Sequence, residues 1–274
     1  MEFSEDEKQV QERAATYIDD HRDEFIQTFV TSKNPLRLGF SAIFMAGSPG
    51  AGKTEFSRRY IPSILDKADR KLMRSLKEKG VDIESVDSLM VRIDADEIRD
   101  FLPSDIYHKT NPEKAVFGNA HVVQPAVNHG LNILRKYCFK NEISFIHDGT
   151  FSNYDGMKNL IEKSLAHKRD VQIFYIYLDP LSAWEFTQAR EYIEGRNIQK
   201  ENFIRQFFNS RENVARIKSE FGSNVRVNCV LKTEGNEYSD VRLNVPDIDN
   251  YLKAGYAKQL IKDYSENDLQ RLLV

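Results

Sequence analysis

Residues 47–54 read Gly47-Ser48-Pro49-Gly50-Ala51-Gly52-Lys53-Thr54, which is the complete phosphate-loop pattern G-x-x-x-x-G-K-[ST]. The apolar run at 40–46 has the length of a buried strand, and residues 54–60 continue without Gly or Pro, as a helix would. A phosphate-binding loop requires this order, because its backbone N–H groups surround the phosphate where a helix begins. The stretch therefore predicts a site for a nucleoside triphosphate. The alternative is a glycine-rich turn that only joins a strand to a helix.

Two side chains of the loop have expected roles that follow from the pattern. Lys53 is expected to reach the β- and γ-phosphates, and the Thr54 hydroxyl is expected to bind Mg²⁺. ATP and Mg²⁺ are therefore the expected cofactors. The chain contains no N-K-x-D motif of a regulatory GTPase and no LSGGQ-like signature of a transporter ATPase. A small-molecule kinase is the class that remains.

The composition is that of an ordinary globular protein of 274 residues, with 41% hydrophobic and 30% charged residues. The net charge of −3 lacks the basic excess of a nucleic-acid-binding protein, so no DNA or RNA partner is expected. No apolar stretch approaches the roughly 18 residues of a membrane span, and the N-terminus is too acidic for a secretory signal. The expected location is the cytoplasm, without a membrane partner. Cys138 and Cys229 are expected to be buried, without a disulfide or zinc site.

Strands alternate with helices after the phosphate loop, which predicts an α/β phosphate-loop kinase fold, a parallel sheet with helices on both faces. Residues 1–37 are a predicted N-terminal helical extension, and residues 38–274 are the predicted kinase domain, with an insertion at 63–90. The predicted strands are 40–46, 91–94, 143–148 and 171–178, followed by a strand or hairpin from 225–231 and 241–245. The predicted helices are one or two within 4–31, then 54–60, 63–79, 113–137, 154–167, 181–221 and 251–273.

Two carboxylates follow the second predicted strand. Ligands of such a sheet gather at the carboxyl ends of the strands, so the phosphate loop, Asp94, Asp96 and residues 148–153 are expected on one rim. A phosphotransferase needs a carboxylate that accepts a proton from the attacking hydroxyl, and often a second that holds Mg²⁺. Asp96 is the predicted base and Asp94 a predicted Mg²⁺ ligand. The alternative for Asp96 is that it caps a helix beginning at Glu97.

The segment 148–153, Asp-Gly-Thr-Phe-Ser-Asn, places carboxylate, hydroxyl and amide groups around a glycine. Asp148, Thr150 and Asn153 are therefore predicted to contact the polar face of a substrate such as a sugar. The alternative is a turn in which the Asp and Asn side chains cap the next helix.

Arg190 and Arg196 flank Gly195 after the fourth predicted strand, where small kinases carry a lid. Negative charge develops on the transferred phosphoryl group, and guanidinium groups stabilise it when a lid excludes water. Both arginines are predicted to clamp the phosphate. The alternative is a helix face exposed to solvent.

These motifs together resemble the zeta toxin family of phosphate-loop kinases. The resemblance covers about residues 38–220 and rests on GSPGAGKTE at 47–55, IDADEIR at 93–99 followed by Pro103 and Tyr107, DGTFSN at 148–153, and the arginines at 190 and 196. Family members with this pattern phosphorylate the sugar 3′-hydroxyl of UDP-N-acetylglucosamine with ATP and Mg²⁺. The resemblance implies that Lys53 and Thr54 bind triphosphate and Mg²⁺, Asp96 is the base, Asp148 and Thr150 contact substrate, and Arg190 and Arg196 clamp phosphate.

The sequence leaves alternatives for the acceptor and for the N-terminal extension. The family often has Glu where Asp148 stands, and kinases of the same fold act on antibiotics, nucleotides, dinucleotides or polynucleotide ends. A non-catalytic switch that binds ATP is the alternative from another class, and the intact Asp96 and lid arginines favour an enzyme. A separate helical antitoxin commonly restrains family members. Residues 1–37 are therefore expected either to restrain activity in cis or to cover a sheet edge.

Overall fold

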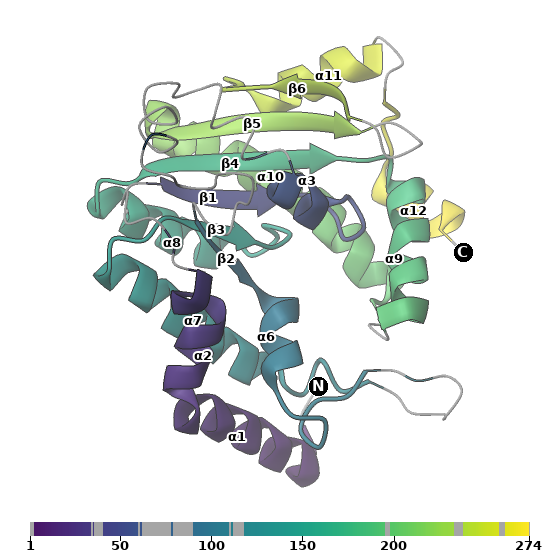
Figure 1. The fold of residues 1–274 in the computed structure, drawn as a ribbon. Helices are drawn as coiled ribbons and strands as arrows, with labels where there is room; N and C mark the ends of the chain where they lie inside the picture. Colours follow the sequence, from purple (N-terminus) through teal and green to yellow (C-terminus); the bar gives the residue numbers. More distant parts are fainter. Residues whose placement is uncertain are drawn as a thin grey trace. The chain divides into compact units, whose positions relative to one another are not determined.

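Figure 1 shows the computed structural model, which describes residues 3–33, 35, 41–59, 61, 78, 90–109, 111, 118–194, 198–232, 238–257 and 261–273. In this part of the chain, six strands form one sheet in the order β2-β3-β1-β4-β5-β6. The chain divides into two compact units. The first comprises Met1–Gly39, Ser57–Ile146 and Glu191–Asn197, and the second comprises Phe40–Phe56, His147–Arg190 and Ile198–Val274.

The second unit contains four strands, β1 (Ser41–Ala46), β4 (Asp170–Tyr177), β5 (Val225–Lys232) and β6 (Tyr238–Arg242). β4 pairs in parallel with β1 and with β5, so the carboxyl ends of these three strands meet at one edge. β6 pairs antiparallel to β5, and the register shifts between Leu231 and Lys232. β4 is buried from Val171 to Tyr177, and apart from Gln172 its buried residues are apolar or aromatic, as expected for a strand covered on both faces.

Helices cover both faces of β4. The helices that belong wholly or partly to this unit are α3 (Lys53–Arg59), α8 (Tyr154–Ala166), α9 (Pro180–Glu194), α10 (Lys200–Phe221), α11 (Ile248–Ala257) and α12 (Glu266–Leu272), with the short turn η4 (Gly222–Asn224). Phe56 on α3 packs against Phe174 with ring centroids 5.6 Å apart, and Phe207 on α10 packs against Tyr177 at 6.1 Å. Side chains alternate along a strand, so Phe174 and Tyr177 point to opposite faces. The helices α3 and α10 therefore lie on opposite sides of β4.

The first unit contains α1 (Glu5–Asp20), α2 (Arg22–Phe29), the turn η1 (Thr31–Lys33), β2 (Val91–Asp94), α6 (Ala95–Phe101) and α7 (Gln124–Lys140). β3 (Phe145–Asp148) begins in this unit and ends in the other. Ser4 and Glu7 form a capping box that starts α1. The rings of Tyr17, Phe25 and Phe29 surround Phe101 at the end of α6, with centroids 5.1 to 5.9 Å away. The N-terminal helices thus share an aromatic core with α6.

The predicted strands are confirmed, with differences of a few residues at their ends, and three predicted helices differ. Residues 113–117 of the predicted helix 113–137 lie outside the described residues. In the described part α7 begins at Gln124, after turns in which the Val122 and Val123 N–H groups bond the Asn119 carbonyl. The stretch 181–221 forms two helices, α9 and α10. The closing stretch 251–273 belongs to α11 and α12, because Ser265 and Asp268 form a capping box that starts a new helix.

Other predictions concern the insertion, the cysteines and the membrane. The insertion at 63–90, with its predicted helix, lies outside the described residues apart from Glu78 and Met90. Cys138 and Cys229 are buried and neither forms a disulfide, as predicted. No helix within the described ranges is long and apolar enough to cross a membrane.

Candidate active site

The phosphate loop leaves β1 and enters α3 at Lys53, as the sequence predicts. Gly47, Gly50 and Gly52 have positive φ angles of 135°, 74° and 79°, which residues with a Cβ atom rarely adopt. A Cβ on Gly47 would also collide with the backbone carbonyl of Ile176 on β4. The Lys53 ammonium group donates a hydrogen bond to the Ser48 carbonyl at 2.6 Å, so the side chain folds back across the loop. A turn that only joined two elements would need none of these features.

The segment 148–153 lies directly against the phosphate loop. The Thr54 hydroxyl donates to the Asp148 carboxylate at 2.9 Å, and the Gly47 N–H donates to the Thr150 carbonyl at 3.3 Å. Asp148 is the last residue of β3 and is buried, so its carboxylate is held where the loop enters α3. The structure therefore brings together two of the predicted site segments, which are about a hundred residues apart in sequence.

Thr54 and Asp148 fit the chemistry of a Mg²⁺ ion bound with a nucleotide. Both offer oxygen atoms, which Mg²⁺ prefers, and Mg²⁺ usually takes only one or two protein ligands beside phosphate oxygens and water. Among the described residues, no group of three or more His, Cys, Asp or Glu side chains could hold a metal ion. A Mg²⁺ ion here would therefore depend on phosphate oxygens for its remaining ligands.

The rest of segment 148–153 makes local structural contacts, and the substrate contacts predicted for Thr150 and Asn153 stay predictions. Phe151 has a φ of 64°, and the buried Asn213 holds this conformation by donating to the Phe151 carbonyl at 3.0 Å. Such a backbone costs about 1–3 kcal/mol in a residue with a Cβ, and it is common near functional sites. The Asn153 side chain caps α8 by accepting from the Gly156 N–H at 3.2 Å, as the alternative interpretation predicted. The Thr150 and Ser152 hydroxyls bond each other at 2.9 Å.

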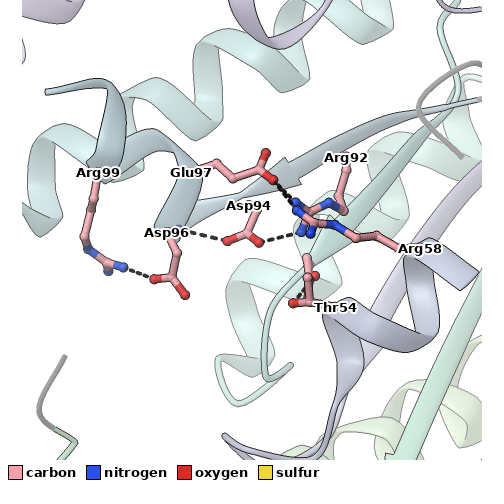
Figure 2. Close-up of polar contacts among 8 residues, drawn as sticks. Thr54, Arg58, Arg92, Asp94, Asp96, Glu97 and Arg99 are labelled. Carbon is pink, nitrogen blue, oxygen red and sulfur yellow. Dashed lines mark hydrogen bonds and ion pairs between the residues drawn. The ribbon is translucent and has the colours of Figure 1, made fainter. Parts of the chain in front are cut away.

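Asp94 and Asp96 belong to the first unit, where Asp94, and not Asp96 as in the alternative interpretation, is the helix cap. Figure 2 shows Asp94 accepting from the Asp96 N–H, at 2.8 Å, so that Asp94 caps α6. The alternative in which Asp96 caps a helix beginning at Glu97 is therefore wrong, because α6 already begins at Ala95. The Asp96 carboxylate instead accepts from Arg99, one turn further along the helix. Its role as a base, and that of Asp94 as a Mg²⁺ ligand, stay predictions.

A buried arginine fixes the start of α6. Arg92 on β2 has only 2% of its side chain exposed, and it forms ion pairs with Asp94, at 2.7 Å, and with Glu97 (Figure 2). Arg58 adds a second guanidinium to Glu97 at 3.1 Å. A buried cation is tolerated only where carboxylates bond it, so this network sets the direction in which α6 leaves the strand.

The structure describes only one of the two predicted lid arginines. Arg190 is exposed on α9, and Arg196 lies outside the described residues. Gly50 of the phosphate loop is so close to α9 that a Cβ there would meet Ala183 and Thr187. Residues 183, 187 and 190 are spaced along one face of a helix, so Arg190 lies one turn beyond the contact with the loop. The clamp function of both arginines stays a prediction.

The chain matches the family described as zeta toxin over residues 26–243. It belongs to the zeta toxin family. The match is longer than the stretch of about 38–220 that the motifs cover, and it begins within α2. No curated protein matches the chain.

Solved structures share the fold of this zeta toxin family member at low sequence identity. A structure of the PezAT chromosomal toxin-antitoxin system of Streptococcus pneumoniae has 15% identity and a TM-score of 0.54, covering 99% of this chain and 93% of that one. The AvrRxo1-ORF1:AvrRxo1-ORF2 complex with sulphate has 13% identity and a TM-score of 0.58, covering 96% and 84%. The complex with ATP has 14% identity and a TM-score of 0.58, covering 89% and 72%. The predicted α/β phosphate-loop kinase fold is confirmed.

Two buried cations of this zeta toxin family member were missed in the sequence. Arg92 lies within the apolar stretch Val-Arg-Ile-Asp, and Lys232 ends the stretch Val-Asn-Cys-Val-Leu-Lys of β5. A cation inside or at the carboxyl end of an otherwise buried strand is the signal that could have revealed both, because burial requires a partner for the charge.

Proposed function

We propose that the chain is an ATP-dependent kinase that phosphorylates the 3′-hydroxyl of the sugar of UDP-N-acetylglucosamine. The observation that carries this proposal is the phosphate loop, with its positive-φ glycines, the folded Lys53 and the Thr54–Asp148 hydrogen bond. Membership of the zeta toxin family supports phosphoryl transfer, and a structural neighbour solved with ATP supports ATP as the donor. The acceptor rests on the resemblance of the four sequence motifs to that family.

Each residue of the loop has a defined task in the proposed reaction. Lys53 exchanges its hydrogen bond with the Ser48 carbonyl for stronger, charge-assisted bonds to the β- and γ-phosphate oxygens. Thr54 and Asp148 would hold Mg²⁺, which would neutralise negative charge that develops during transfer. Asp148 is therefore proposed as a Mg²⁺ ligand in addition to the substrate contact predicted for it.

The proposed acceptor chemistry uses the remaining predicted residues. Asp96 accepts the proton of the attacking hydroxyl. Arg190 and Arg196 stabilise the negative charge that develops on the phosphoryl group during transfer. Thr150 contacts the sugar. The Asn153 side-chain oxygen already caps α8. Asn153 would therefore contact the substrate only through its side-chain NH₂ group.

A protein antitoxin is the proposed partner. The neighbours are a chromosomal toxin-antitoxin system and the complex AvrRxo1-ORF1:AvrRxo1-ORF2. A partner of this kind would restrain the kinase by covering its nucleotide or acceptor site.

The test is to incubate the purified protein with ATP, Mg²⁺ and UDP-N-acetylglucosamine, and in parallel with a metabolite extract, and to identify phosphorylated products by mass spectrometry. Lys53→Ala should abolish transfer, because the loop loses the ammonium group directed at the β- and γ-phosphates. Arg59→Ala, which removes an exposed cation from the same helix, is the matched control and should retain activity. Labelling of another metabolite, with no product from the nucleotide sugar, would reject the acceptor. Full turnover in Lys53→Ala would reject the kinase site itself.

A further inference from the structure

Lys232 is a buried cation at the carboxyl end of β5, the edge of the sheet at which the phosphate loop lies. Only 1% of its side chain is exposed. The register between β5 and β6 shifts just before it, between Leu231 and Lys232. Shifts of this kind redirect side chains at the ends of strands and often lie beside active sites.

The Lys232 ammonium group lies against the phosphate loop. A Cβ on Gly52 would collide with the Lys232 Nζ atom, and the Glu55 carboxylate is 3.8 Å from the same nitrogen. The φ of 79° favours glycine at position 52, and its lack of a side chain leaves room for this ammonium group. Gly52 directly precedes Lys53, so the two ammonium-bearing side chains flank consecutive parts of one loop.

The charges around this part of the loop favour the binding of an anion. Burial disfavours an ammonium ion and lowers the pKa of Lys232, while the nearby Glu55 carboxylate raises it in part. The Glu55 carboxylate lies at an ion-pair separation of 3.8 Å from the Lys232 Nζ atom. Lys53 brings a second positive charge to the same loop. A polyphosphate bound in the loop would be attracted by both ammonium groups, and it would reduce the repulsion between them.

We propose that Lys232 is a second phosphate-binding cation of the nucleotide site, acting beside Lys53 on the phosphate chain of a nucleoside polyphosphate. This inference rests on the proposed function, since it assumes that the loop binds such a nucleotide. The rival interpretation is structural: the Lys232–Glu55 pair would only tie β5 to α3. The two differ in their dependence on phosphate, because a structural tie affects the fold and a phosphate ligand affects affinity.

The experiment compares the dissociation constants of ATP, ADP and adenosine for the full chain and its variants by calorimetry. Lys232→Met removes the charge and keeps an unbranched side chain one atom shorter than that of lysine. We expect it to weaken ATP binding by about 10-fold to 100-fold, the loss typical of a hydrogen bond to a charged group, and to leave adenosine binding unchanged. Lys232→Gln, which keeps a polar group, repeats the comparison and serves if the Met variant does not fold.

Arg226→Met is the matched control, because it removes a cation at the opposite end of the same strand. Arg226 forms an exposed ion pair with Asp170 at the start of β4, away from the carboxyl ends of the strands. It should bind ATP as the wild type does. If the wild type binds ATP and the Lys232 variants bind it equally well, or lose adenosine as strongly as ATP, the inference is overturned. If the wild type binds no nucleotide at all, the proposed function fails first.

Discussion

The Asp96 carboxylate, the proposed base, is held in place by its neighbours. Arg99 is almost fully buried and donates both to Asp96 and to the side-chain oxygen of Gln124, the first residue of α7. The planar guanidinium group imposes a fixed geometry on both partners, so the carboxylate is restricted before any substrate binds. Because Asp94 caps the helix, Asp96 is available for chemistry without loss of the cap.

Asp96→Asn should therefore leave ATP affinity near the wild-type value and lower the turnover by about 10²- to 10⁴-fold, the range for loss of a general base. Binding is measured by calorimetry and turnover by product formation. Asp100→Asn on the same helix is the control, because Asp100 forms an exposed ion pair with Lys109 at 2.9 Å. If ATP affinity collapses in Asp96→Asn while each bound complex still turns over normally, Asp96 has a structural or metal-binding role instead.

At the scale of elements, α11 is fastened to β6 by a hydrogen bond that depends on pH. The Tyr251 hydroxyl donates to the Asp240 carboxylate at 2.6 Å. Burial, and then the bond to Asp240, raise the pKa of Tyr251 well above its ordinary value. An unfolded tyrosine loses its proton near pH 10, so above that pH the folded state holds more protons than the unfolded state. Stability must then fall as the pH rises.

Tyr251→Phe should be less stable than the wild type near pH 8, by about 0.5–1.5 kcal/mol, because a hydrogen bond is lost. Between about pH 8 and pH 10.5 the wild type should lose more stability than the variant, so that the difference narrows. Urea unfolding at both pH values measures this. Parallel losses in the two proteins would show that Tyr251 does not keep its proton in the folded state.

The elements differ in how well the sequence predicts them. The strand, loop and helix around residues 47–54 follow from local chemistry alone, because the glycines and Lys53 act within one loop. The closing helix was predicted as one element, although Ser265 and Asp268 carry the sequence pattern of a new start. This capping pattern predicts that a new helix starts after Ser265.

Contacts between residues far apart in the chain limit how much of the site the sequence predicts. Thr54 bonds Asp148, 94 positions away, and Lys232 reaches Gly52, and neither pairing has a signal in the local sequence. Asp148 was therefore predicted only as a substrate contact, and Lys232 was not predicted at all. Such contacts depend on strand order, which brings residues together at the ends of strands regardless of their separation in the chain.

At the scale of the whole molecule, the N-terminal helices pack into the first unit. α1 contacts α7, and α2 contacts β2, the strand at one edge of the sheet. Phe25 is fully buried, and Gly130 on α7 leaves room for it: a Cβ there would lie 3.0 Å from the Phe25 ring. These contacts favour the interpretation in which residues 1–37 cover a sheet edge and complete a core. The predicted domain boundary at residue 37 stays a prediction.

Removing residues 1–35 separates this interpretation from restraint in cis. The deletion exposes Phe101, whose ring packs against Tyr17, Phe25 and Phe29, so the melting temperature should fall and ATP turnover should stay equal or decline. In the full chain, Phe25→Ala should cost about 3–5 kcal/mol, the range for a buried ring. Phe186→Ala is the control, because that ring is 42% exposed and its loss should change stability little. A shortened protein that remains folded and turns over ATP faster than the full chain would instead establish that the N-terminal helices restrain the kinase.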